Sequence, residues 1–560
     1  MKIGDRRPTA GRGQYERLIA LLIILIALVY AGSRIWRELG ELATTDPVAY
    51  VQTYLSAPEL PTLTINMAFT ERENLLGQRA TALSDGVYLA SETDFQPATI
   101  EFREPDGQIQ EIPVRLRLRQ GPAVNLGQGE KWPIDVRTRN GEFLYGMRRF
   151  TLQDPAENNW LNQWAFSRSL EQAGLLTSRT YFANLVLNGQ PQGIYAIQEG
   201  FGEEIMTSQG RVPGVIVEFD ADRLWEIIRY YEGNGGAALA DPFLNLTMAD
   251  YRSFEVDAFR DSSLLRDPEL AAQRSQAIGL LRSLQEGKVD ARDVFDVDKY
   301  GTFLALVDLW AATDALSLVN LRFYYNPDSG KLEPIGFNGN PLQENSRISA
   351  SNLFDDLEIQ RSYLESAESV SRPEFIDQLQ AQIDPELREL QRALNVEQNV
   401  EPPWDLLRER QRQMQRSLNP IRPIFAYLGP PSSDFIQVDV ANVFGLPIEV
   451  TGFNIGGTTF LEVNPGWIQE KDPNLLLDDD AGRIILSPQS MPALSYLRFH
   501  IPLVEIERLN SELVGLSDIE VSVTTRLIGR DDVQLTPAQS GYPPSLLPSG
   551  EGLSGDNSHE

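Results

Sequence analysis

One stretch, residues 308–340, most constrains the fold of this chain. An apolar run with helical spacing ends there just before Asp314, and two strand-like runs follow, joined by a turn of Asn, Pro, Asp, Ser and Gly. Asn320 stands before the first strand-like run, and Asn338 stands after the second. A helix end and a hairpin are therefore predicted to bring three polar side chains back to one place.

This layout is typical of a phosphoryl-transfer centre. In such a centre a carboxylate orients the attacking hydroxyl, and two further oxygen ligands hold Mg²⁺ on the phosphates. The alternative is an ordinary helix followed by a hairpin whose ends are polar. The residues alone leave both interpretations open.

The amino-acid composition excludes several kinds of catalytic and metal site. The chain has 560 residues, a formal net charge of −30, no Cys and two His, His500 and His559. So acidic a surface repels phosphate backbones, which argues against nucleic acid as a partner. Without Cys, and with so few His, thiol catalysis, a His-dependent triad and most zinc sites are excluded or nearly so. Chemistry must rest on carboxylates, amides, Lys, Arg and hydroxyls.

Residues 18–33 carry no charge, and Ile35 and Trp36 extend this run to about the length of a membrane-spanning helix. The preceding flank holds five basic residues, so we expect a single-pass membrane protein with a cytoplasmic N-terminus and an extracytoplasmic bulk in the cell envelope. A cleaved signal peptide is the alternative, but residues 31–34 make a poor cleavage site and the apolar run is long.

In residues 112–119 the apolar side chains Ile112, Val114, Leu116 and Leu118 fall on one face, and Arg115, Arg117 and Arg119 fall on the other, as in a strand with one buried face. Arginines on such a face can hold phosphate oxygens by bidentate contacts. The alternative is that these arginines are exposed to solvent and pair with the many carboxylates of the chain. A glycine-rich stretch, residues 121–129, follows and leads to Lys131 on the next strand. Glycines there would let backbone NH groups approach an anion.

The order of patterns along the chain predicts six segments. They are a basic cytoplasmic tail at 1–17, a transmembrane helix at 18–36, a linker at 37–61, a domain of strands and helices at 62–429, a β-sandwich-like module at 430–535 and a disordered tail at 536–560.

Several short motifs between residues 62 and 345 occur in an order that resembles the CotH kinase family, named for a spore coat protein. They are RLRLR at 115–119, EKW at 130–132, LYGMRRF at 144–150, LNG at 187–189, GIYAIQE at 193–199, NLRFYYN at 320–326 and IGFNG at 335–339. The resemblance implies an α+β chain with a two-lobed protein-kinase-like core, a β-rich N-lobe and a helical C-lobe, between the transmembrane helix and the β-sandwich-like module.

The resemblance also implies a nucleotide site and its cofactors, ATP and Mg²⁺ or Mn²⁺. Lys131 would contact the nucleotide phosphates and Arg119 would support them. Glu199 would lie near the base of the site, where the two lobes join.

For the reaction itself, the resemblance implies that Asp314 orients the acceptor hydroxyl, with Asp308 as the alternative. Asn320 and Asn338 would ligate the metal. The family has an aspartate where this chain has Asn338, and an amide brings no charge to a hard cation.

Two functions follow as hypotheses. The first is a membrane-anchored, CotH-like enzyme, degenerate or weakly active in Mg-nucleotide-dependent phosphoryl transfer to a protein or envelope acceptor. The second is a non-catalytic pseudokinase that acts as a scaffold or binding protein in cell-envelope or polysaccharide assembly. Expected partners are the membrane and an envelope protein or polysaccharide.

Overall fold

The computed structural model describes residues 58–127, 131–220, 222–233, 252, 254–259, 264–342, 356–469, 475–477, 481–489, 494–510 and 519–541. The predicted cytoplasmic tail and transmembrane helix, and most of the predicted linker and disordered tail, lie outside these residues. Within the described ranges, no helix is both long and apolar enough to cross a membrane.

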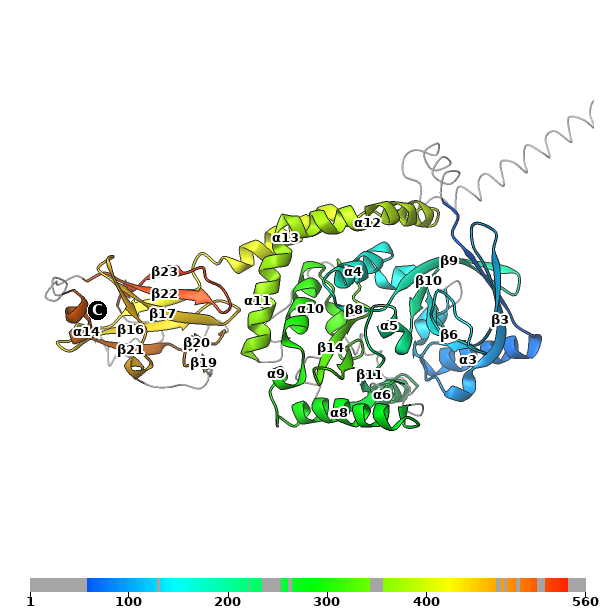
Figure 1. Ribbon diagram of the computed structural model, residues 1–560, viewed down its shortest axis with the longest axis horizontal. Coiled ribbons are helices and arrows are strands. Elements are labelled where there is room, and N and C mark those ends of the chain that lie inside the picture. The colour runs from blue at the N-terminus through cyan, green and yellow to red at the C-terminus, as the bar shows by residue number, and fades with distance from the viewer. Residues whose placement is uncertain are drawn as a thin grey trace, which may run out of the picture. The chain divides into compact units, whose positions relative to one another are not determined.

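Seven strands close into a barrel in the first part of the described chain (Figure 1). Their order is β1 (Thr62–Asn66), β3 (Gln96–Arg103), β4 (Ile109–Leu118), β6 (Ile134–Thr138), β7 (Arg149–Gln153), β10 (Gln190–Glu199) and β9 (Thr180–Leu187). The parallel pairing of β1 with β9 closes the ring, and every other neighbouring pair is antiparallel.

The barrel interior is a packed apolar core. Ile112, Val114, Leu116 and Leu118, alternate residues of β4, are each 0% exposed. The alternation predicted for residues 112–119 is therefore confirmed through β4, and its arginines lie on the outer wall of the barrel.

A second sheet follows the barrel along the chain. Its strand order is β12 (Glu255–Ala258), β11 (Val215–Asp220), β13 (Arg322–Asn326), β14 (Lys331–Gly336) and β8 (Leu176–Thr177). The hairpin β13–β14 and the preceding helix α10 (Val297–Leu309) confirm the elements predicted for residues 308–340. The 3₁₀ turn η5 (Thr313–Leu316) lies between them.

Helices separate and flank these sheets. They are α3 (Phe69–Asp85), α4 (Leu161–Gln172), α5 (Glu203–Thr207), α6 (Asp222–Gly233), α8 (Pro268–Gln285), α9 (Ala291–Val294), α10, α11 (Leu357–Ser371), α12 (Pro373–Leu394), α13 (Trp404–Leu418) and α14 (Leu503–Leu509). The chain divides into two compact units, one of residues 1–60 and 385–402 and one of the remainder. In the described part of the smaller unit, the side chain of Gln391 donates to the carbonyl of Val400 at 2.9 Å.

Two further sheets form the C-terminal region. One contains β21 (Leu497–Pro502), β16 (Phe435–Asn442), β15 (Ile424–Leu428) and β24 (Gln539–Ser540). The other contains β19 (Leu476–Leu477), β20 (Ile484–Leu486), β17 (Ile448–Ile455), β22 (Val521–Leu527) and β23 (Gln534–Pro537), with β18 (Thr459–Glu462) paired to β17. Phe453 of β17 and Phe499 of β21 pack edge to face at 5.2 Å.

The expected two-lobed protein-kinase-like core is wrong. The structure is α+β, but its N-terminal strands form a closed seven-stranded barrel rather than the open sheet of a kinase N-lobe. Closure depends on the pairing of residue 62 with residue 184, a contact between distant segments that strand periodicity does not encode. The predicted hairpin β13–β14 also joins β11 in a five-stranded sheet, in the region that was expected to form a helical lobe.

Candidate functional site

A cleft of about 760 Å³ is lined both by residues of the barrel and by residues of the second sheet. From the barrel and its loops come, among others, Arg117, Arg119, Gln120, Asp135 and Gln153. From the second sheet and the segments next to it come Glu218, Asp220, Asp222, Trp225, Phe259, Asn320, Arg322 and Asn338. Of the predicted site residues, Arg119, Asn320 and Asn338 thus share one cleft.

Two arginines stand on the barrel wall of the cleft because β4 turns its charged face outward. Arg117 lies 3.6 Å from the carboxylate of Asp135 and over the ring of Phe95 at 4.5 Å. Arg119 differs, because its guanidinium donates to the side-chain oxygen of Gln153 at 2.7 Å and, in the described part of the chain, forms no ion pair. Among the described residues, the positive charge of Arg119 therefore has no acidic partner, in a protein of net charge −30.

Arg322, the first residue of β13, supplies the cation on the opposite wall. Its guanidinium is 2.7 Å from the carboxylate of Glu218 and lies over the rings of Phe201, Phe259 and Phe337 at 5.3 to 6.0 Å. Burial lowers the pKa of Arg322, and the positive charge of Arg119 lowers it further. Both guanidinium groups line the same cleft, and their positive charges repel each other.

Glu218 is the titratable acid of the cleft. Burial raises the pKa of Glu218 to about 7, although the charge of Arg322 acts in the opposite direction. The carboxylates of Asp220, Asp257 and Asp222 raise it further. Glu218 can therefore exchange a proton near neutral pH, as a general acid or base must.

A row of side-chain amides runs from Arg119 to the second sheet. The side chain of Gln153 donates to Gln198 at 3.1 Å, Gln198 donates to Asn338 at 3.0 Å, and Asn338 donates to Asn320 at 3.5 Å. Because a guanidinium can only donate, Arg119 sets the orientation of Gln153, and each amide then orients the next. This row holds the two asparagines at the cleft wall.

The predicted metal ligands do not fit a hard divalent cation. The side-chain oxygens of Asn338 and Asn320 already accept hydrogen bonds from neighbouring amides, and neither carries charge. Mg²⁺ is bound mainly by charged oxygen ligands such as carboxylates and phosphates. Across the described residues, no group of three or more His, Cys, Asp or Glu side chains could hold a metal ion. No metal step is therefore assigned to this site.

The two candidate catalytic aspartates, Asp314 and Asp308, have different surroundings. The carbonyl of Asp314, in η5, accepts from the side chain of Asn320 at 2.9 Å, and its carboxylate accepts from Asn340 at 3.3 Å. Asp314 thus adjoins the cleft through Asn320. Asp308 instead pairs with Arg410 at 3.0 Å and accepts from the hydroxyl of Tyr363 at 2.9 Å, a contact between α10, α11 and α13.

Lys131 was predicted on a strand, but it lies three residues before β6 begins, and it is not among the described residues that line the cleft. Its ammonium donates to the carbonyl of Ile194 at 2.8 Å and lies 4.0 Å from the carboxylate of Asp154. The rings of Trp160 and Tyr195 lie 5.6 and 5.9 Å from it. Through its bond to Ile194, Lys131 connects the segment before β6 with strand β10.

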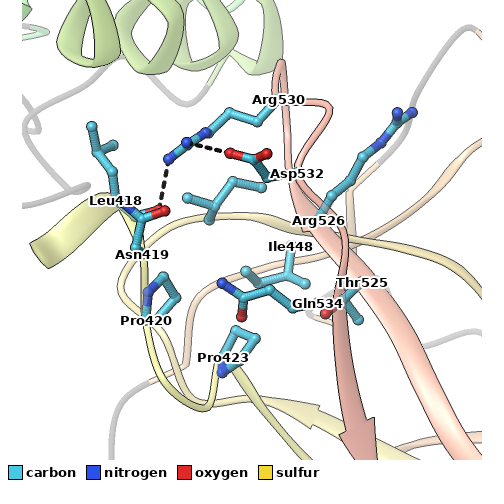
Figure 2. Close-up of a pocket in the computed structure, with 11 residues that line it drawn as sticks. Leu418, Asn419, Pro420, Pro423, Ile448, Thr525, Arg526, Arg530, Asp532 and Gln534 are labelled. Carbon is cyan, nitrogen blue, oxygen red and sulfur yellow. Dashed lines mark hydrogen bonds and ion pairs between the residues drawn. The ribbon is translucent and has the colours of Figure 1, made fainter. Parts of the chain in front are cut away.

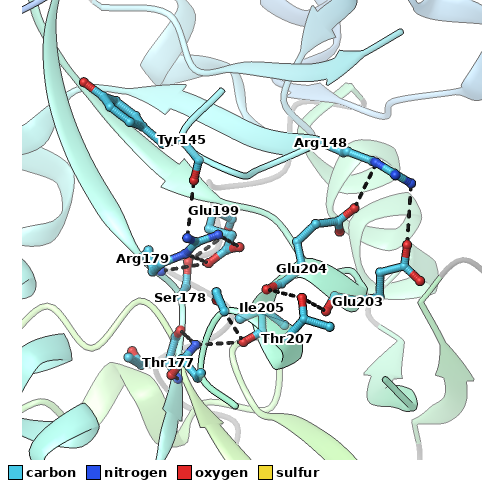
Figure 3. Close-up of polar contacts among 12 residues, drawn as sticks. Tyr145, Arg148, Thr177, Ser178, Arg179, Glu199, Glu203, Glu204, Ile205 and Thr207 are labelled. Atoms are coloured by element: carbon cyan, nitrogen blue, oxygen red, sulfur yellow. Dashed lines mark hydrogen bonds and ion pairs between the residues drawn. The ribbon is translucent and has the colours of Figure 1, made fainter. Parts of the chain in front are cut away.

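Glu199 is buried in a polar network at the end of β10, outside the cleft lining (Figure 3). It is 1% exposed and accepts from the guanidinium of Arg179 at 2.6 and 2.8 Å. Burial raises the pKa of Glu199, while the charge of Arg179 opposes that shift. In Figure 3, Arg179 also donates to the carbonyl of Tyr145, so this pair joins barrel segments.

Sequence reasoning missed Glu218 and Arg322. Glu218 follows three apolar residues of β11, and Arg322 begins the mainly aromatic strand β13, so both strands resemble ordinary core elements. The available signal was their opposite charge on strands that pair with each other, since Glu218 stands directly opposite Arg322 in the β11–β13 register. That register could not be known from the sequence.

A second hollow, in the C-terminal region, carries no comparable arrangement (Figure 2). It measures only about 10 Å³. Arg530, which lines it, donates to the carbonyl of Leu418 at 2.8 Å and to Asp532 at 2.7 Å. Its charged group is already satisfied, so we assign the functional site to the larger cleft.

Comparisons with known proteins do not name a family for this chain. No protein-family model matches it, and no curated protein matches it. The resemblance to the CotH kinase family therefore stays a prediction, and the function must be argued from the cleft.

Proposed function

We propose that the protein binds a small phosphate-bearing ligand in the cleft between the barrel and the second sheet. The observation that carries this proposal is the charge of Arg119, which has no acidic partner in the described chain and faces the charge of Arg322. A phosphate between the two guanidiniums would remove their repulsion and accept charge-assisted hydrogen bonds from both.

The charges around the cleft favour a small ligand over a polymer. Glu218, Asp220 and Asp222 line the same space, and the whole chain carries a net charge of −30. A polyanion would meet these carboxylates along its length, whereas a single phosphate can reach Arg119 and Arg322 alone. A volume of about 760 Å³ is in the range of small-molecule sites.

The setting we propose is the cell envelope, with the protein as a binding component of envelope or polysaccharide assembly. Support comes from the uncharged run at residues 18–33 and its basic flank, which predict an anchor with the bulk of the chain extracytoplasmic. The resemblance to the CotH kinase family supports a phosphate-bearing ligand.

Phosphoryl transfer from a bound nucleotide is the second candidate function. It is favoured by Asp314, whose backbone carbonyl accepts from the cleft-lining Asn320 and whose carboxylate accepts from Asn340. Incubation of the full chain with labelled ATP and Mg²⁺ or Mn²⁺ tests it, with Asn338→Asp beside the wild type. Label transferred to protein, above the level of a Asp314→Asn variant, supports transfer; no transfer by either protein leaves binding as the function.

Isothermal titration of the full chain with inorganic phosphate, pyrophosphate and ATP tests the binding proposal. Arg119→Gln should weaken binding about tenfold or more, because a hydrogen bond to a charged group contributes about 1.5–3 kcal/mol. Arg115→Gln is the matched control, since Arg115 is on the same face of β4 but lies over Phe95, outside the cleft lining. Equal affinities in all three proteins would refute the proposal.

A further inference from the structure

An apolar pocket of about 110 Å³ adjoins the cleft. Its walls include Met206, Ile216, Phe259, Leu264 and Leu270. Met206, Ile216 and Leu264 are at most 8% exposed. Glu203 also lines this pocket, but the larger side chains of its walls are otherwise apolar, so the pocket offers contacts to an apolar group.

Phe259 connects this pocket with the cleft, because its side chain lines both. The guanidinium of Arg322 lies 5.3 Å from the centre of the Phe259 ring. Ile216 of the pocket and Glu218 of the cleft stand two residues apart on β11, so the two spaces are neighbours along one strand.

We propose that the ligand is amphiphilic, a phosphate monoester whose apolar tail occupies the pocket beside Phe259. This inference rests on the proposed function, because the phosphate end is the one assigned to Arg119 and Arg322. Met206 suits such a role, since its unbranched side chain adapts to the shape of different tails. The cleft supplies charge for one end of the ligand, and the pocket supplies apolar contact for the other.

The size of the pocket sets the expected tail. A volume of about 110 Å³ is that of a few water molecules, so the pocket has room for a short alkyl chain only. Each methylene buried there should tighten binding about fourfold, which corresponds to about 0.8 kcal/mol. Affinity should therefore rise along a series of alkyl phosphates and level off once the pocket is full.

Titration of the full chain with inorganic phosphate, ethyl phosphate and hexyl phosphate tests this. We expect hexyl phosphate to bind at least about tenfold more tightly than ethyl phosphate. Equal affinities for the two esters would overturn the amphiphile while leaving the phosphate site in place. Failure of the wild type to bind any of the three probes would instead overturn the proposed function.

Two variants locate the tail. Leu270→Trp, at the start of α8, fills the pocket and should abolish the preference for hexyl phosphate without changing the affinity for inorganic phosphate, which also shows that the variant is folded. Leu265→Trp is the control, because Leu265 is 58% exposed and is not among the described residues lining the pocket. A preference for hexyl phosphate that survives in Leu270→Trp would overturn the assignment to this pocket.

The same chemistry could come from a soluble ester or from a lipid. Co-sedimentation with phosphatidylcholine vesicles, with and without phosphatidic acid, separates these sources. A lipid ligand raises the retention of the wild type, but not of Leu270→Trp, on vesicles with phosphatidic acid above that on phosphatidylcholine alone, whereas a soluble ester gives each protein equal retention on both kinds of vesicle.

Discussion

The replacement Glu218→Gln tests the electrostatics of the cleft through stability. The ordinary pKa of Glu is 4.5, and burial raises that of Glu218 to about 7 in the folded protein. Between these pH values the folded state binds a proton that the unfolded state has lost. The free energy of unfolding must therefore decrease as pH rises from 4.5 to 7, by about 3 kcal/mol at about 1.36 kcal/mol per pKa unit.

Glutamine resembles the protonated acid and still offers an oxygen to Arg322, so Glu218→Gln should lack this decrease. We expect the variant and the wild type to be about equally stable near pH 4.5, and the variant to be more stable by up to about 3 kcal/mol at pH 8. Urea unfolding at several pH values measures the difference. Glu73→Gln, at an exposed position of α3, is the control for the loss of one surface charge.

A stability difference between Glu218→Gln and the wild type that stays constant from pH 5 to 8 would refute this reasoning. A variant that is less stable than the wild type at pH 8 would show that the ion pair with Arg322 outweighs burial. Either result would contradict the assignment of proton exchange near neutral pH to Glu218.

Three other replacements test the fold that holds the site. Gly336→Ala should destabilise the protein by about 1–3 kcal/mol in urea unfolding, because the new methyl collides with a side chain of α4, whereas Gly279→Ala, on an open helix face, should stabilise it by about 0.5–1 kcal/mol. Arg179→Met should lower the free energy of unfolding by about 3–5 kcal/mol because it leaves Glu199 buried and unpaired, and adding Glu199→Leu should restore much of that loss. Tyr363→Phe removes a hydrogen bond to a carboxylate and should lower the melting temperature, with a loss of about 1–3 kcal/mol.

The elements around the site could be predicted from local patterns. The alternation of residues 112–118 identified β4, and the helix and hairpin of residues 297–337 were found because each has a clear period or turn signal. Arg119 could be singled out from the same alternation, and Asn338 from its place at the end of a strand-like run. These are properties of short segments.

The barrel closure and the pairing of Glu218 with Arg322 could not be predicted, because they depend on contacts between distant segments. Pairing of β1 with β9 closes the barrel, and nothing in residues 62–66 indicates which strand they join. Glu218 and Arg322 meet only because β11 pairs with β13, across roughly a hundred residues of chain. The two-lobed fold was predicted from the order of short motifs, and that order says nothing about closure.

A crystal structure of the full chain soaked with tungstate, a heavy analogue of phosphate, tests the central claim most directly. We predict tungstate between Arg119 and Arg322, with its oxygens about 2.7–3 Å from both guanidinium groups. An empty cleft at a tungstate concentration that saturates the protein in titration, with the anion bound at another surface, would contradict the account.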